Sequence, residues 1–76
     1  MRHHQLLDDA TGAGPDWSAR SKYLALSELL TNSGHPITLR AVEKWFVRQS
    51  LPTKWLFLIA AAATAAGRPI DLNKYA

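Results

Sequence analysis

The stretch from Thr38 to Pro52 reads TLRAVEKWFVRQSLP and decides the fold. Its apolar residues recur at a spacing of three or four, which is the period of a helix with one buried face. They are Leu39, Val42, Trp45 and Phe46, with Gln49 on the same side. Thr38 can cap the amides of the first turn, and Pro52 disfavours helical backbone in the residue before it. The stretch therefore predicts an amphipathic helix from Thr38 to about Ser50.

A second helix is predicted before this one, from about Ser18 to Ser33, with Asp16 or Ser18 as its N-cap. Its apolar side chains again keep a helical spacing. They are Ala19, Tyr23, Leu26 and Leu30, with Leu29 widening the stripe. Gly34 suits the left-handed position after a helix, and Pro36 prevents continuation. The end of this helix is therefore well defined.

A third helix is predicted to open at Pro52 or Thr53 and to run to Ala66, with Gly67 as its stop. Apolar residues surround it from Trp55 to Ile59, so we expect it at the centre of the core, in contact with both other helices. A closing segment follows from Arg68, whose structure the sequence leaves open. Its apolar residues can pack back on the body, and they are Ile70, Leu72 and Tyr75.

The N-terminal residues show no sustained apolar period, and the stretch from Thr11 to Pro15 is a cluster of turn and breaker residues. We therefore expect a flexible tail over residues 1–17 and one folded domain over residues 18–76. The predicted fold class is all-α: a compact bundle of three helices, or four, with a flexible N-terminal tail. The expected core residues are Leu26, Leu30, Val42, Phe46, Trp55 and Ile59.

Length and composition limit the possibilities further. Seventy-six residues hold one compact core, and the absence of cysteine excludes disulfides and thiolate metal sites. Among the usual ways of stabilising so small a domain, self-association is then the most accessible. No apolar leader precedes Asp9, and the run from Trp55 to Ala63 is too short to span a bilayer. We expect a cytoplasmic protein.

Positive charge is concentrated in the predicted domain. Residues 1–17 carry a balance of −2 and residues 18–76 a balance of +5, which favours a polyanionic partner. Arg40, Lys44 and Arg48 are spaced by four, so they form a row opposite the apolar face of their helix. A solvated helix face often carries such residues, so the row becomes informative only with its context: the turn containing Gly34 and the small basic helical unit.

This context favours double-stranded DNA. Arginine and lysine side chains one turn apart can reach both phosphates and guanine edges in a major groove, which admits a helix. Ala41 would allow close approach and could touch a thymine methyl group, and the amides near Thr38 could hold a phosphate. The predicted DNA-binding residues are Thr38, Arg40, Ala41, Lys44 and Arg48.

The stretch from Thr38 to Pro52 also resembles the recognition helix and following turn of small phage-type helix-turn-helix regulators of the Cro and YdaS kind. In that family a valine and a tryptophan three apart pack the recognition helix, as Val42 and Trp45 are placed here, and Ile-Pro or Leu-Pro opens the next helix. The similarity covers about Tyr23 to Tyr75. It implies a helix-turn-helix fold, operator DNA as the ligand, and binding as a homodimer, as in prophage regulators.

The chain departs from this family before the recognition helix. The turn from Asn32 to Ile37 is longer than the family's tight one, and the family's two short upstream helices read here as one longer helix. Either that helix bends near Tyr23 and Leu24, or the family's first helix is missing.

The leading hypothesis is a sequence-specific DNA-binding transcription regulator. The alternative is a small protein-interaction module that docks on the transcription machinery or another regulator through apolar patches near Val47, Trp17 or the closing segment. RNA binding has less support, because the sequence shows neither an exposed aromatic pair nor a Gly-x-x-Gly loop. We expect no enzyme, cofactor or metal, since the sequence has no recognisable catalytic set and the histidines lack companion ligands.

Overall fold

The computed structural model describes residues 2–75, and these form four α-helices and one short 3-10 helix. The elements are α1 (His3–Thr11), α2 (Ala19–Asn32), α3 (Leu39–Val47), α4 (Thr53–Ala65) and η1 (Leu72–Tyr75). The described chain contains no strand, so the all-α class is confirmed with four helices. No helix within residues 2–75 is both long enough and apolar enough to cross a membrane.

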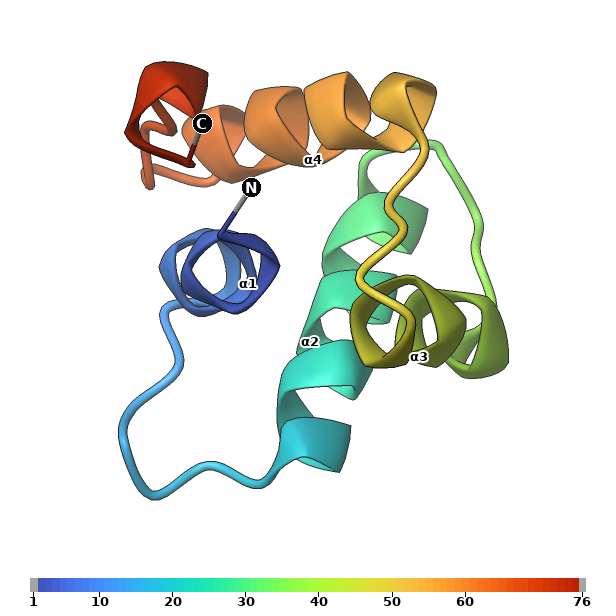
Figure 1. The fold of residues 1–76 in the computed structure, drawn as a ribbon. Coiled ribbons are helices and arrows are strands. Elements are labelled where there is room, and N and C mark those ends of the chain that lie inside the picture. Colours follow the sequence, from blue (N-terminus) through green and yellow to red (C-terminus); the bar gives the residue numbers. More distant parts are fainter. Residues whose placement is uncertain (1, 76) are drawn as a thin grey trace.

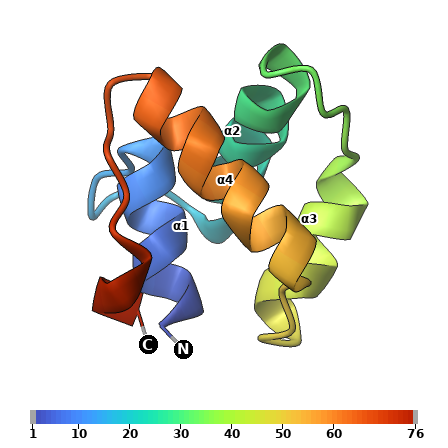
Figure 2. The same ribbon diagram turned by 90° about the horizontal axis from the view of Figure 1, so that it is seen from above.

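Helix α2 is the element against which the other three pack. Helices α1 and α3 lie on opposite sides of it, and α4 crosses over one end (Figure 1). The view from above shows α4 lying across the bundle, with α1 and α3 on either side (Figure 2). The expectation that the helix after Pro52 occupies the centre was wrong, because α4 leaves one face in solvent, where Phe57 is 59% exposed.

The predicted flexible tail over residues 1–17 was also wrong. Residues His3–Thr11 form α1, and Leu6, Leu7 and Ala10 are completely or almost completely buried. Three apolar residues are too few to show a sustained helical period in the sequence, and they are buried because α1 packs against α2 and α4. Gly12 ends the helix in the left-handed conformation (φ 70°), and the Arg68 side chain lies so close that a Cβ there would meet its Nε at 2.6 Å.

Polar contacts fasten α1 to the rest of the molecule. Lys22 Nζ lies 2.8 Å from Asp8 Oδ1, which joins α1 to α2. The Tyr75 hydroxyl donates a hydrogen bond to Asp9, and the Arg2 amide donates to the Tyr75 carbonyl at 2.9 Å. The closing segment therefore packs on α1, and the two ends of the described chain lie side by side (Figure 1).

The prediction that the six expected core residues are largely buried was confirmed. Leu26, Leu30, Val42 and Ile59 are fully buried and Phe46 is 1% exposed, while Trp55 is partly buried and packs against this core. One face of the Trp55 indole meets Trp45, with ring centroids 5.1 Å apart, and the Lys54 ammonium lies 5.9 Å from the Trp55 ring centroid. Trp55 therefore lies at the edge of the core.

Helix α2 runs without interruption through Tyr23 and Leu24, so the structure has one continuous helix there. Its N-cap is Ser18, whose hydroxyl accepts a hydrogen bond from the Ser21 amide at 3.2 Å. This settles the choice that the sequence left between Asp16 and Ser18. An upstream helix is present as well, since α1 precedes α2, and a loop from Gly12 to Ser18 joins them.

Candidate nucleic-acid interface

The candidate interface is the outward face of α3. Thr38 caps this helix, because its Oγ1 accepts a hydrogen bond from the Ala41 amide at 3.2 Å. The first intrahelical bond runs from the Val42 amide to the Thr38 carbonyl (3.2 Å), so the Leu39 and Arg40 amides point out of the helix end. The helix starts where the sequence predicted and stops slightly earlier, with Arg48 as its C-cap.

The inner face of α3 fixes its orientation. Val42, Trp45 and Phe46 are buried, and the Phe46 ring stacks on Tyr23 of α2 with centroids 5.9 Å apart and planes 17° apart. Turning α3 about its axis would break this stacking and expose Val42. The residues on the opposite face are therefore held toward solvent by the core.

A side chain that sequence reasoning missed sets where α3 begins. Ser27 lies on the buried side of α2, and its hydroxyl donates a 2.8 Å hydrogen bond to the Ile37 carbonyl, just before the Thr38 cap. The turn from Ser33 to Thr38 is longer than a tight helix-turn-helix turn, so this bond holds its far end against α2. In the sequence, the sign of this hydrogen bond is a serine that lies between the buried positions Leu26 and Leu30.

The outward face brings Arg40, Lys44 and Arg48 together, and all three are exposed. These three residues are called the basic ridge below. They line one shallow hollow with Glu43 and Val47. Val47 follows Arg40 by seven residues, so it lies on the same face, and it is 66% exposed.

The basic ridge carries unneutralised charge. Within residues 2–75 no carboxylate lies in ion-pair range of its three cations, and the ion pair that is present joins Lys22 to Asp8 on the other side of α2. Glu43 is the acidic residue that shares the hollow. The surface therefore offers three long cationic side chains on a helix face about two turns in length.

The other predicted contact residues lie at the edges of this face. Thr38 is exposed at the start of α3, and Ala41 is partly covered on its flank. A straight rod approaching the ridge would meet Arg40 and Lys44 before Ala41. The described residues contain no group of three histidine or acidic side chains that could hold a metal ion.

Comparisons with known protein families, with curated proteins and with solved structures found no match to this chain.

Proposed function

We propose that this protein is a sequence-specific, double-stranded DNA-binding regulator that inserts α3 into the major groove. The carrying observation is that Arg40, Lys44 and Arg48 are exposed on one helix face, with no carboxylate of residues 2–75 in ion-pair range. A helix fits the major groove, and cations at one-turn spacing can reach both the base edges and the phosphates. The resemblance to small Cro-type and YdaS-type regulators supports the same conclusion.

The position of each cation suggests its role. Arg40 is nearest the helix start, the end that helix-turn-helix proteins direct at base edges, so we assign base reading to it. Lys44 and Arg48 lie further along and are assigned to phosphates. The Leu39 and Arg40 amides add donors for a phosphate oxygen at the helix end.

The test is a binding titration with three alanines in place of the basic ridge. The triple variant R40A/K44A/R48A should stay folded, because all three side chains are exposed, and should lose specific and nonspecific duplex binding. Its control is R20A/K54A/K74A, which removes the same charge from exposed positions outside α3. If both variants bind a duplex as the parent does, DNA recognition by α3 is wrong, and the protein-interaction module replaces it.

Single substitutions separate the roles within the ridge. Arg40→Ala should cost about 1 to 3 kcal/mol on the specific site and relax preference at one base position. Lys44→Ala should weaken all sequences alike and reduce the salt dependence by about one ion. Sites are first selected from a random duplex pool, and each variant is then titrated at several salt concentrations. Equal loss on specific and scrambled duplexes for Arg40→Ala would contradict its base-reading role.

Homodimeric binding belongs to the same proposal. One short recognition helix reads few base pairs, and a symmetric pair would place two of them about 34 Å apart on one side of the duplex. Tyr75 of the closing segment is used inside its own chain, whereas Phe57 on α4 is exposed, so we assign the contact to α4. Sedimentation of the protein on a palindromic duplex should give two copies, and a single copy would contradict the assignment.

A further inference from the structure

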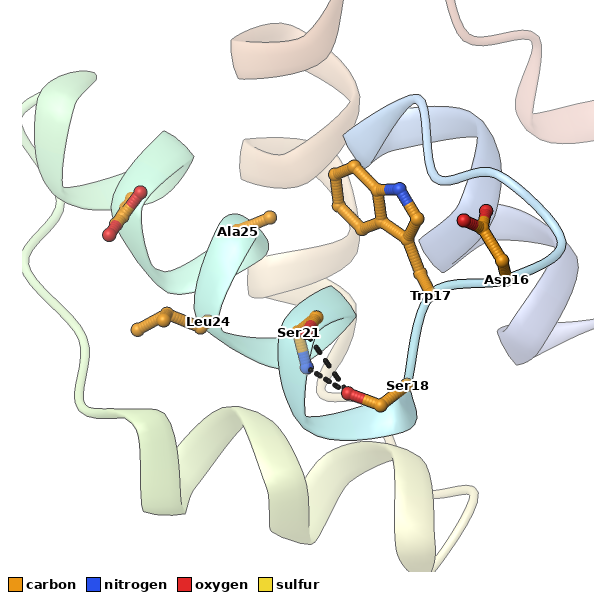
Figure 3. A pocket seen from close by; sticks show the side chains of 7 residues that line it. Asp16, Trp17, Ser18, Ser21, Leu24 and Ala25 are labelled. Atoms are coloured by element: carbon orange, nitrogen blue, oxygen red, sulfur yellow. Dashed lines mark hydrogen bonds between the residues drawn. The ribbon is translucent and has the colours of Figure 1, made fainter.

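A second surface of the molecule is apolar in the middle and acidic at its ends. It lies where the loop after α1 meets the outer face of α2, and it is called the Trp17 groove. Its lining residues are Asp16, Trp17, Ser18, Ser21, Leu24, Ala25 and Glu28. Figure 3 shows Trp17 and Asp16 on the loop, Ala25 on the side of α2 toward Trp17, and Leu24 on the other flank of α2.

The Trp17 groove is well fixed in shape. The Trp17 amide donates to the Gly14 carbonyl at 3.2 Å, and Ser18 caps α2 through the Ser21 amide (Figure 3). Trp17 and Leu24 nevertheless stay 40% and 46% exposed. Two large apolar side chains open to solvent in one hollow make this surface a candidate for contact with another molecule.

The negative charge of the Trp17 groove indicates what kind of molecule can bind there. Asp16 and Glu28 stand toward its two ends, and no described cation lies within ion-pair distance of either carboxylate. The occupant should therefore present an apolar side chain flanked by cations. The outward face of α3 has this composition, because the exposed Val47 lies among the three cations of the basic ridge.

The spacing along the two helices agrees as well. Glu28 lies ten residues beyond the Ser18 cap of α2, a rise of about 15 Å, and Asp16 lies just before that cap. Arg40 and Arg48 are eight residues apart, about 12 Å along α3, and their flexible side chains can extend the span at both ends. Helix-in-groove recognition uses such regularly spaced positions.

We propose that the Trp17 groove binds the α3 face of a second copy of this chain, with Val47 against Trp17 and Ala25 and the basic ridge against Asp16 and Glu28. The two surfaces are different parts of the molecule, so the contact is head-to-tail and leaves one groove and one ridge free for further copies. It covers the face assigned to DNA, so duplex and self-association exclude one another. The contact itself does not depend on DNA binding.

The first experiment is sedimentation of the full chain without DNA at low and high salt. At low salt the parent should sediment faster as its concentration rises, because it self-associates. This self-association should disappear at high salt. Glu28→Lys and Lys44→Glu should each abolish self-association, since each reverses a charge on one side of the contact. The matched controls Asp71→Lys and Lys54→Glu change the net charge identically at exposed positions outside both surfaces, and both should still self-associate.

The second experiment mixes the two defective variants. Glu28→Lys retains an intact basic ridge and Lys44→Glu retains an intact groove, so one good contact remains between them. The mixture should form a 1:1 complex that grows no further, about tenfold tighter than either variant's association with itself. Native mass spectrometry gives the stoichiometry, with circular dichroism confirming that both variants are folded.

Nitrogen-15 NMR locates the contact. Labelled Lys44→Glu protein, titrated with unlabelled Glu28→Lys protein, should show a shift of the Trp17 indole N–H, while the Trp45 and Trp55 indoles stay in place. The proposal is overturned if the parent remains unassociated at low salt, if Glu28→Lys and Asp71→Lys behave alike, or if the Trp17 indole does not respond. None of these outcomes bears on the duplex titrations, so the proposed DNA-binding function is tested separately.

Discussion

Helices α1 and α3 are equally long, with nine residues each, but they are held in different ways. Helix α3 has a side-chain cap at Thr38, and its inward face is a regular apolar stripe. Helix α1 has no side-chain N-cap bond at Arg2, and contacts with α2, α4 and Tyr75 hold it in place. Local signals therefore specify α3, whereas tertiary contacts specify α1.

The outward faces differ in the same sense. Helix α3 directs three unpaired cations into solvent, while α1 uses two of its charged residues inside the molecule, Asp8 toward Lys22 and Asp9 toward Tyr75. Substitutions on the outer face of α3 should therefore change binding alone. Substitutions on α1, or on the inner face of α3, should change stability.

The largest expected effect is Phe46→Ala, on the inner face of α3. Phe46 is 1% exposed and stacks on Tyr23, so its loss leaves a cavity at the junction of α2 and α3. The cost should be about 3 to 5 kcal/mol, comparable to the whole stability of a small domain. Thermal melts give the value, and an unchanged midpoint would contradict the packing of α3.

Leu6→Ala tests whether α1 belongs to the same cooperative unit. Leu6 is fully buried, and its truncation should cost about 2 to 5 kcal/mol in urea unfolding. The matched control is Leu24→Ala on α2, which shortens a leucine that is 46% exposed and should cost far less. If the two variants unfold alike, residues 3–11 contribute nothing to the core.

These two positions also show what can be predicted from the sequence. Phe46 lies in a nine-residue helix whose apolar spacing and Thr38 cap are visible locally, so its burial was predicted. Leu6 stands in a short segment with one pair of leucines and a nearby alanine, followed by glycines and a proline. Nothing local distinguishes it from a flexible tail, since the contacts that hold its helix come from α2, α4 and η1, all later in the chain.

The candidate site divides in a similar way. The spacing of Arg40, Lys44 and Arg48 predicted a shared exposed face, because helical geometry alone sets it. The Ser27 contact with Ile37 and the Trp17 groove could not be predicted, since both depend on how a loop lies against α2. Helical periodicity in the sequence shows which residues share a helix face, but it does not show how a loop runs between two helices.

Tyr75→Phe should have a smaller, pH-dependent effect. Burial of Tyr75, followed by its hydrogen bond to Asp9, raises its pKa from 10.0 to about 12. Because the folded-state pKa is the higher one, the stabilisation is complete below pH 10 and is lost as the pH rises through 12. At neutral pH the variant should lose about 1.5 kcal/mol.

The measurement is urea unfolding of the parent and of Tyr75→Phe at several pH values. The difference between them should shrink above pH 10, because the phenylalanine has no proton to lose. Tyr23 and the lysines are present in both proteins, so their titration cancels in the difference to first order. A difference that is constant from pH 8 to pH 11.5 would contradict the contact between the closing segment and α1.

The smallest expected effect concerns the starts of the two helices and tests the comparison most directly. Thr38→Ala removes the hydroxyl that accepts the Ala41 amide, and should cost about 1 kcal/mol, whereas Thr38→Ser should keep most of the stability. Arg2 occupies the same position in α1 but makes no side-chain cap bond there, so Arg2→Ala should stay within about 0.5 kcal/mol of the parent. The three variants are compared by chemical unfolding, with amide exchange at the start of each helix as a second readout. Thr38→Ala should speed exchange at Ala41 and leave α1 unchanged, because the cap acts on its own turn. Equal losses for Thr38→Ala and Arg2→Ala would mean that the cap does not distinguish α3, and that both helices are held by packing alone.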